Sequence, residues 1–311
     1  MGDPSREVLG EDVWHARCHL HQARVDEWVQ PHLSRRNARQ SHPVEDFLFT
    51  YYSHRPSALR RWHPGLGCIL SGVESSSYLG LKGYVELSSS TSREPGVTVS
   101  GEYVDSQRPL LSSIDRLLTV TANRSAQLGC FGMHEWAMVY QADHDGVRHS
   151  SWPLRLGATG TDEVVDTHRI ACSHFDAFRF FTASARPLNT LQPSHDDRTT
   201  FEQPGCLHAG MDLYKHAFRL SPMICSDLVA DCFELARDIR VLDMRASPYD
   251  LSALGYPPVK VETAKGKQEY AAAQRAFAVR GQPLRRRLID ECDRLLTLVS
   301  QPPTRSRRHQ R

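Results

Sequence analysis

The amino-acid sequence predicts a mainly α-helical (α+β) protein, a helical domain with a small antiparallel β-sheet. Apolar residues recur at spacings of three and four over long stretches, whereas the alternation typical of strands is confined to short ones. The 311 residues include 38 Lys and Arg, 36 Asp and Glu and 40% hydrophobic residues, which excludes a disordered, collagenous or strongly nucleic-acid-like composition. We expect one globular domain over 1–300, which could include an irregular β-containing insert over 65–105, and a basic disordered tail over 301–311.

The sequence also indicates the cellular compartment. No apolar run is long enough to cross a bilayer, and the first residues lack the apolar stretch of a signal peptide. The eight cysteines contain no Cys-x-x-Cys pair, which predicts reduced thiols rather than a zinc ribbon. We therefore expect a cytoplasmic protein with no membrane partner.

Helical spacing predicts each helix in turn. The predicted helices cover 14–30, 44–54, 108–123, 128–140, 161–168, 206–220, 226–245 and 265–299. Pro31 should end the first of these helices, and Gly281-Gln282-Pro283 should interrupt the last one. The helix over 128–140 is almost wholly apolar, so we expect it to be buried.

Strands are expected where β-branched and aromatic residues alternate between turn signals. The predicted strands cover 83–87, 147–156 and 169–182, with a hairpin turn at 143–146 before the second. In the last strand, alternation would place Cys172, His174, Asp176 and Phe178 on one face. His174 could then orient Asp176 for general acid or base catalysis, or the two could form a structural hydrogen bond.

Two further segments combine a histidine with a carboxylate. His208 and Asp212 are spaced i, i+4 on a predicted helix, which suits two ligands of one metal, a histidine with a fixed tautomer, or a surface pair. His134 and Glu135 lie in the apolar helix, where unpaired burial is costly. Either they are catalytic or Glu135 is paired with one of the arginines.

Together the three segments contain the ligand types of a mononuclear metal site. The candidate ligands are His134, Glu135, His174, Asp176, His208 and Asp212. The His-Glu-x-x-His motif is absent, because Met138 stands at its last position. A phosphate-binding loop and a Gly-x-Ser-x-Gly elbow are also missing, which disfavours nucleotide-dependent phosphoryl or hydride transfer.

Arginines and aromatic residues interleave after the second predicted helix, a composition that suits base stacking with phosphate contacts. The residues concerned are Tyr52, Arg55, Arg60 and Arg61. A helix with a solvated basic face would have the same composition. Asn189 and Gln192 lie in a polar loop and could read a base edge, or belong to an ordinary turn.

Six runs of residues carry a resemblance to a known family. The runs are 43–48, 131–140, 172–181, 187–193, 203–215 and 228–251. They resemble a family of bacterial, mainly actinobacterial, proteins that carry the name 3-methyladenine DNA glycosylase, over 14–296. The resemblance implies hydrolysis of the N-glycosidic bond of an alkylated purine. Gly210 and His216 depart from the Asn and Trp of that family, so the chain could be a specialised paralogue with another ligand, for instance in a biosynthetic pathway.

The leading hypothesis is therefore a DNA-glycosylase-like hydrolase that needs no cofactor and binds DNA. Its catalytic candidates are His134, Glu135, His174 and Asp176, its substrate-binding candidates are Tyr52, Trp136, Asn189, Gln192, His208 and Asp212, and its nucleic-acid contacts are Arg55, Arg60 and Arg61. The alternative is a small-molecule enzyme dependent on a divalent metal, either non-haem iron or a hydrolytic metal. A third is a non-catalytic protein with buried polar networks.

Overall fold

The computed structural model describes residues 7–87, 96–142 and 152–300. Its regular elements, in chain order, are β1 (Glu7–Leu9), α1 (Glu11–Asn37), α2 (Phe47–Tyr51), α3 (Pro56–Arg60), β2 (Cys68–Ser71), η1 (Val73–Tyr78), β3 (Tyr84–Leu87), β4 (Gly96–Val99), α4 (Gly101–Ser106), α5 (Arg108–Ala122), α6 (Met133–Ala137), α7 (Gly157–Thr167), α8 (Phe175–Phe178), η3 (Arg186–Leu188), α9 (Arg198–Phe201), α10 (Leu207–Leu220), α11 (Ser226–Arg245), η4 (Ser252–Leu254) and α12 (Ala264–Ser300). The protein is thus mainly helical with one small sheet, as the sequence predicts.

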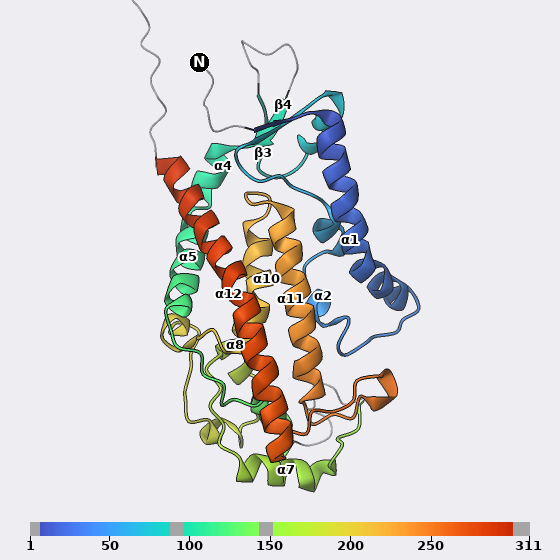
Figure 1. The fold of residues 1–311 in the computed structure, drawn as a ribbon, viewed down its shortest axis with the longest axis vertical. Coiled ribbons are helices and arrows are strands. Elements are labelled where there is room, and N and C mark those ends of the chain that lie inside the picture. The colour runs from blue at the N-terminus through green and yellow to red at the C-terminus, as the bar shows by residue number, and fades with distance from the viewer. Residues whose placement is uncertain (1–6, 88–95, 143–151, 301–311) are drawn as a thin grey trace, which may run out of the picture.

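The core is a bundle in which α12 runs along most of the molecule beside α5, α10 and α11 (Figure 1). The apolar stripe of α5 explains its place, because Leu111, Ile114 and Leu118 recur at helical spacing and are at most 3% exposed. Helix α10 is buried on almost every side between α11 and α12. A helix enclosed in this way can hold polar side chains away from water.

The sheet lies at one end of the bundle, above α1 and α4 (Figure 1). Its strand order is β1-β2-β4-β3, and β1 pairs with β2 in parallel while the other pairs are antiparallel. The prediction of an antiparallel sheet is therefore wrong for β1. A long connection that contains α1 separates the two strands, and such a connection allows parallel pairing.

Two prolines lie inside helices that they were expected to break. Helix α1 continues past Pro31 to Asn37, and α12 is continuous through Pro283. A helical proline removes the hydrogen bond to the carbonyl four residues earlier. Those residues are Glu27 and Val279, and both are exposed, so water can solvate the carbonyls that lose their donors.

The predicted strand over 169–182 is absent. Ile170 forms only an isolated bridge with Asn189, and the chain then turns into α8. The side chains of Cys172, His174 and Asp176 therefore do not share a strand face, because the alternation ends where α8 begins.

Three other predictions need correction. The apolar segment 128–140 is helical only over α6, because Phe131 and Gly132 adopt positive φ angles of 49° and 72°. The predicted helix over 44–54 shortens to α2. Of the strand over 147–156, residues 152–156 form only the bridge of Leu154 with Tyr249, and the rest, like the turn at 143–146, lies outside the described residues.

The remaining elements agree with the sequence. The predictions over 83–87, 108–123, 161–168, 206–220 and 226–245 are confirmed by β3, α5, α7, α10 and α11. All eight cysteines are free thiols. None of the helices in the described part of the chain combines the length and apolar character that a membrane crossing needs. The tail over 301–311 lies outside the described residues.

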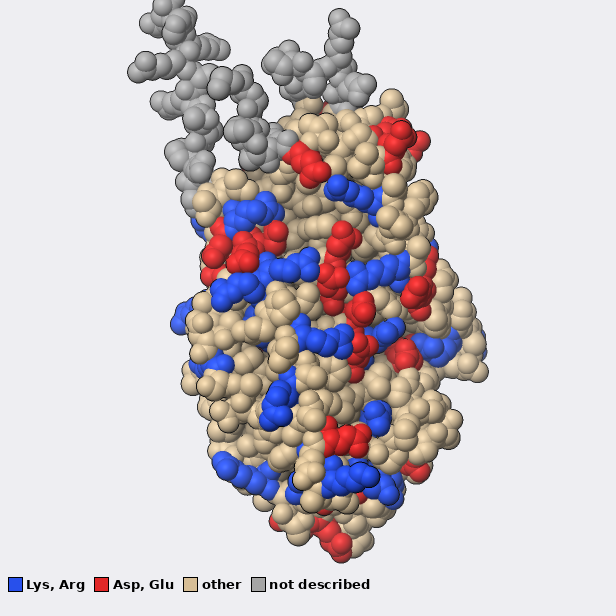
Figure 2. Space-filling view, viewed as in Figure 1, with Lys and Arg blue, Asp and Glu red and all other residues tan. Residues whose placement is uncertain are grey.

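Basic and acidic side chains alternate over the face that α11 and α12 form (Figure 2). Ion pairs link these two helices, with Arg280 2.8 Å from Asp238 and Arg287 2.8 Å from Asp231. This face therefore has no continuous basic surface.

Candidate active site

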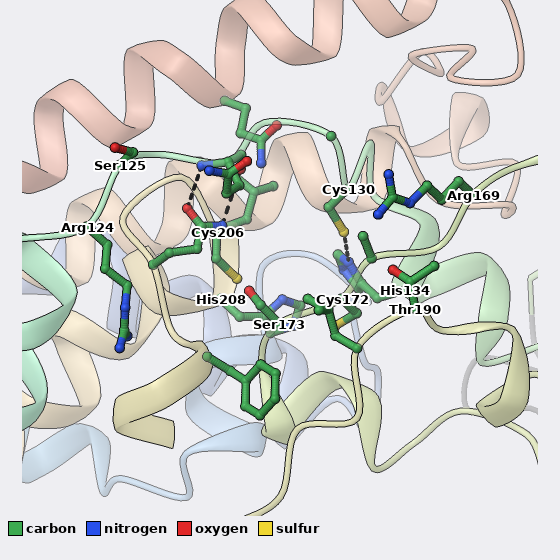
Figure 3. Close-up of a pocket in the computed structure, with 18 of the residues that line it drawn as sticks. Arg124, Ser125, Cys130, His134, Arg169, Cys172, Ser173, Thr190, Cys206 and His208 are labelled. Carbon is green, nitrogen blue, oxygen red and sulfur yellow. Dashed lines mark hydrogen bonds between the residues drawn. The ribbon is translucent and has the colours of Figure 1, made fainter. Parts of the chain in front are cut away.

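A cavity of about 510 Å³ lies between the end of α5, the start of α6, the start of α10 and the first half of α12 (Figure 3). Residues 124–130 form one wall, and 169–173 with 190–191 form another. Phe201 and Gln203 precede α10, while Tyr270 and Gln274 extend from α12. The cavity has the size of a small-molecule site.

Cys130, His134 and Asp243 form a hydrogen-bonded chain that begins at the cavity wall. Cys130 Sγ lies 3.8 Å from His134 Nδ1, and His134 Nε2 donates to Asp243 Oδ1 at 2.8 Å. Cys130 is half-buried and lines the cavity, whereas Asp243 is fully buried behind the imidazole. The order thiol, imidazole, carboxylate is that of a nucleophile with its base and the group that orients the base.

A strained turn places the thiol at the cavity. Phe131, directly after Cys130, has a left-handed backbone, which is unfavourable for a bulky residue. Gly132 follows with the same sign of φ, and α6 then brings His134 back beneath Cys130. The i, i+4 spacing of Cys130 and His134 thus becomes a contact although most of the segment is not helical.

Burial and the neighbouring charges together determine the protonation of His134 and Asp243. Burial alone would lower the pKa of His134, but the adjacent Asp243 carboxylate more than offsets this, so the pKa is raised well above its usual range. Burial would raise the pKa of Asp243, yet the charges of His134 and Arg240 hold it well below its usual range. The imidazole is therefore a proton carrier backed by a permanent negative charge.

Arg240 neutralises both buried carboxylates behind the cavity. Its Nη1 donates to Glu135 Oε1 at 2.9 Å and to Asp243 Oδ2 at 2.7 Å, and its guanidinium lies over the Phe47 ring. The interpretation of Glu135 as the partner of an arginine is therefore confirmed. Glu135 does not line the cavity, so the structure gives it no place to contact a substrate.

Further polar groups line the cavity without partners among the described residues. His208 is 8% exposed, and its ring packs edge-on against His134 with no hydrogen bond to the rest of the described chain. Burial and the positive charge of His134 lower the pKa of His208 well below its usual range, so this ring is neutral. The buried Gln274 Oε1 also has no hydrogen-bond partner. Both groups can bind a polar ligand.

A second polar cluster lies behind the cavity around His174. The ring nitrogens of His174 lie 3.5 Å from Glu202 Oε1 and 3.5 Å from Asp212 Oδ2. Arg198 bridges these carboxylates with contacts of 2.6 Å and 2.9 Å, and Lys215 also contacts Asp212. Burial would raise the pKa of Asp212, but Lys215 and His174 lower it well below its usual range. The cluster is an internally neutralised ion network.

Two buried groups in the described part of the chain, at the cavity and behind it, could hold a metal ion. They are His134 with His208 and Asp243, and His174 with Glu202 and Asp212, each with ligand atoms within 4.8 Å of one another. The first group fits a metal only if the hydrogen bond between His134 and Asp243 is given up. The second fits less well, because two basic side chains already occupy its carboxylates. A third, surface group comprises Glu11, His15 and Glu74.

Four predicted site residues converge in the structure. The rings of His134 and His208 lie 4.5 Å apart, those of His208 and His174 lie 5.4 Å apart, and Asp212 contacts His174. Tyr52 joins this group, since its hydroxyl donates to Asp212 Oδ1 at 2.9 Å. The three segments that pair a histidine with a carboxylate therefore do meet in one region.

Asp176 does not join them. It lies in α8, where its carboxylate is 3.1 Å from Arg179 and 3.4 Å from Lys215, away from the cavity lining. His174 faces Asp212 and Glu202 instead. The prediction that His174 orients Asp176 is therefore wrong, because the segment bends into a helix between the two residues.

The side chains of three other predicted site residues form hydrogen bonds with the backbone of the fold. Trp136 is fully buried and donates to Ala246 O. Asn189 is bonded on both sides of its amide to the backbone of Cys172, and Gln192 donates to Asn189 O. The side-chain amides of Asn189 and Gln192 hold the loop beside the cavity and are not presented to a ligand.

The predicted nucleic-acid contacts do not form one basic surface with the cavity. Arg60 is paired with Asp26, to which it donates at 2.9 Å. Arg55 and Arg61 are exposed at either end of α3 and do not line the cavity.

Sequence reasoning missed several residues of the site. The sequence predicts only a reduced thiol at Cys130, and it does not distinguish Asp243 and Arg240 from other charged residues. One signal was present, since Arg240 and Asp243 stand i, i+3 among apolar residues of α11, where unpaired charges are costly. Glu202 lies in an irregular segment that gives no such signal. Comparison of the chain with family models, with curated proteins and with solved structures gives no match.

Proposed function

We propose that this protein is an enzyme in which the Cys130 thiol attacks a small molecule bound in the cavity. The observation that carries the proposal is the continuous chain from Cys130 through His134 to Asp243 at the cavity wall. His134 is the general base and acid, and Asp243 orients its ring.

The reaction that best suits this arrangement is acyl transfer to water. The proton of the Cys130 thiol is held on His134 Nδ1, which makes the charged imidazolium that Asp243 stabilises, and Cys130 Sγ forms a bond to the carbonyl carbon of the substrate. The bond from that carbon to its leaving group breaks, and His134 returns the proton to the leaving group. Water then cleaves the thioester, which yields a carboxylic acid and restores the thiol. The neutral ring of His208 is placed to donate a hydrogen bond to the oxyanion.

The test is the alkylation of Cys130 by iodoacetamide at pH 6.5, followed by peptide mass spectrometry. We expect Cys130 to react before Cys172 and Cys206, which line the same cavity and whose pKa values are raised by burial. In His134→Gln the rate at Cys130 should fall by at least about tenfold, and in Asp243→Asn by less. An unchanged rate in His134→Gln would remove the proposed activation.

A metal-dependent enzyme is the second candidate, because His134, His208 and Asp243 form a compact set of two histidines and one carboxylate beside the cavity. The His208→Gln variant separates the two proposals. A metalloenzyme should bind about one iron, zinc or manganese ion, lose Tm on treatment with EDTA, and lose that response in the variant. A thiol enzyme should show no EDTA response and retain alkylation of Cys130 in the variant.

DNA-glycosylase activity, which the resemblance implies, is a third proposal with weaker support. The size of the cavity suits an extruded base. However, the carboxylates expected to assist the cleavage, Glu135 and Asp176, are both engaged in ion pairs outside the cavity lining. Release of 3-methyladenine from methylated DNA by the wild type would support this proposal, and its absence would remove it.

A further inference from the structure

The cavity is lined by positive charge without a compensating carboxylate. Arg124 and Arg169 belong to its wall, and no Asp or Glu among the described residues does. Arg124 is fixed by backbone carbonyls alone, since it donates to Glu202 O at 2.7 Å and to Thr199 O. These contacts hold the guanidinium in place and leave its charge available.

Arg169 is exposed, and its guanidinium has no hydrogen bond or ion pair to any residue that the structure describes. This contrasts with the arginines of α11 and α12, several of which pair with carboxylates. Figure 3 shows Arg169 on the side of the cavity where Cys130 and His134 lie, and Arg124 on the opposite side. The two cations therefore lie on opposite sides of the cavity, Arg169 on the side of the thiol.

The other polar groups of the lining add to this potential. Helix α10 begins at the cavity, and the partial positive charge of its N-terminus faces it. His208, more than nine-tenths buried and without a hydrogen-bond partner among the described residues, lies in the first turn of that helix. A cavity with such walls concentrates anions.

We infer that the substrate of this site is a small organic anion whose carboxylate or phosphate group is drawn in by Arg124 and Arg169. The inference rests on the proposed function only in placing the reacting carbon at Cys130. The binding of the anion depends on the two arginines, whatever the chemistry of the thiol.

The experiment compares two alkylating reagents that differ in charge. Iodoacetate is anionic and iodoacetamide is its neutral analogue, so the ratio of their rates at Cys130 reports the potential of the cavity. We expect this ratio to exceed the ratio for glutathione by about tenfold at low salt, and to fall as salt is added. The Arg124→Gln/Arg169→Gln variant should return the ratio to that of glutathione. Arg55→Gln, an exposed arginine outside the lining, is the control for the loss of charge and should leave it unchanged.

Protection of Cys130 from iodoacetate by a competing anion distinguishes a phosphate group from a carboxylate group on the substrate. If inorganic phosphate slows the reaction of iodoacetate more than acetate does at equal ionic strength, the substrate is phosphorylated. The reverse order indicates a carboxylate. A rate ratio equal to that of glutathione in the wild type, or one that the double variant leaves high, would overturn the inference while the thiol proposal stands.

Failure of the proposed function gives a different result. If neither reagent modifies Cys130, the thiol proposal fails, and the Tm then tests the anion site alone. A rise in Tm with phosphate or acetate in the wild type and in Arg55→Gln, but not in the double variant, would support the inference. No rise in the wild type would overturn it.

Discussion

Arg240 is the cation shared by the buried carboxylates of Glu135 and Asp243. It is 1% exposed and stands between the carboxylates of Glu135 and Asp243. A buried carboxylate without its partner is strongly destabilising, whereas the intact pair contributes little net stability. The fold therefore needs Arg240 mainly because the carboxylates of Glu135 and Asp243 are buried and require a cation.

Replacement of this arginine should be far more costly than replacement of a surface one. We expect Arg240→Met to lower the free energy of unfolding by about 3–5 kcal/mol, because it leaves the buried Glu135 carboxylate without its cation and leaves Asp243 with His134 alone of its two charged partners. The matched control is Arg280→Met, which breaks an exposed pair with Asp238 and should cost less than about 1 kcal/mol. Urea denaturation of both variants measures the difference, and equal losses would contradict this account.

The sequence predicts that a buried charged residue needs a partner, but it does not predict which residue that partner is. Glu135 in an apolar segment requires a cation, and that much follows from its neighbours. Arg240 lies 105 positions away in the chain, so no local pattern selects it among the arginines. The roles of Cys130 and Arg169 likewise have no local signal in the sequence, because they come from a cavity that forms only in the folded chain.

At the scale of the elements, helical spacing predicts α5, α10 and α11 because each has an apolar stripe that packs in the bundle, α5 against α12 and α10 against α11. It fails at Pro31 and Pro283, where each helix continues because the carbonyl that loses its donor is exposed to water. It also fails near the site, where the positive φ of Phe131 ends what would otherwise be an apolar helix. Strained positions of this kind have no signature in periodicity.

Helix α12 offers a paired test of helix stability. Gly281→Ala should raise the free energy of unfolding by roughly 0.5–1 kcal/mol, because alanine favours the helix and its Cβ would lie an ordinary 3.5 Å from Leu235. Gly266→Ala should lower it, because the same atom would lie 1.9 Å from Lys260 O. Thermal unfolding of the two variants gives the sign. Stabilisation by both substitutions would show that the start of α12 is not packed as described.

For the whole molecule, buried neutral histidines set the response to acid. Burial lowers the pKa of His54 to about 4 and the pKa values of His63 and His216 to about 3. Between pH 6.5 and these values the unfolded chain binds more protons than the folded one, so the stability falls as the pH falls. The pKa shift of His134 changes the stability in the opposite direction. Its raised pKa contributes stability that is fully present below pH 6.5 and is lost as the pH rises through the folded value.

We therefore expect the Tm to decline from about pH 6.5 downward, well before the carboxylates of Asp212 and Asp243, whose pKa values are lowered, begin to take up protons. The decline should be shallower in His63→Gln. His195→Gln, at an exposed position, serves as the control. A Tm that stays constant between pH 6.5 and 4.5 would show that these histidines are accessible to protons in the folded state.

The position of Tyr270 and Gln274 on α12 has a consequence for biosynthesis. The cavity receives this wall from the last helix of the fold, whereas Cys130 is made well over a hundred residues earlier. During translation, at roughly 5–20 residues per second, the thiol waits for several seconds before its enclosure can be completed. Each nascent chain thus passes through a stage in which oxidants and electrophiles reach Cys130 without first entering the cavity.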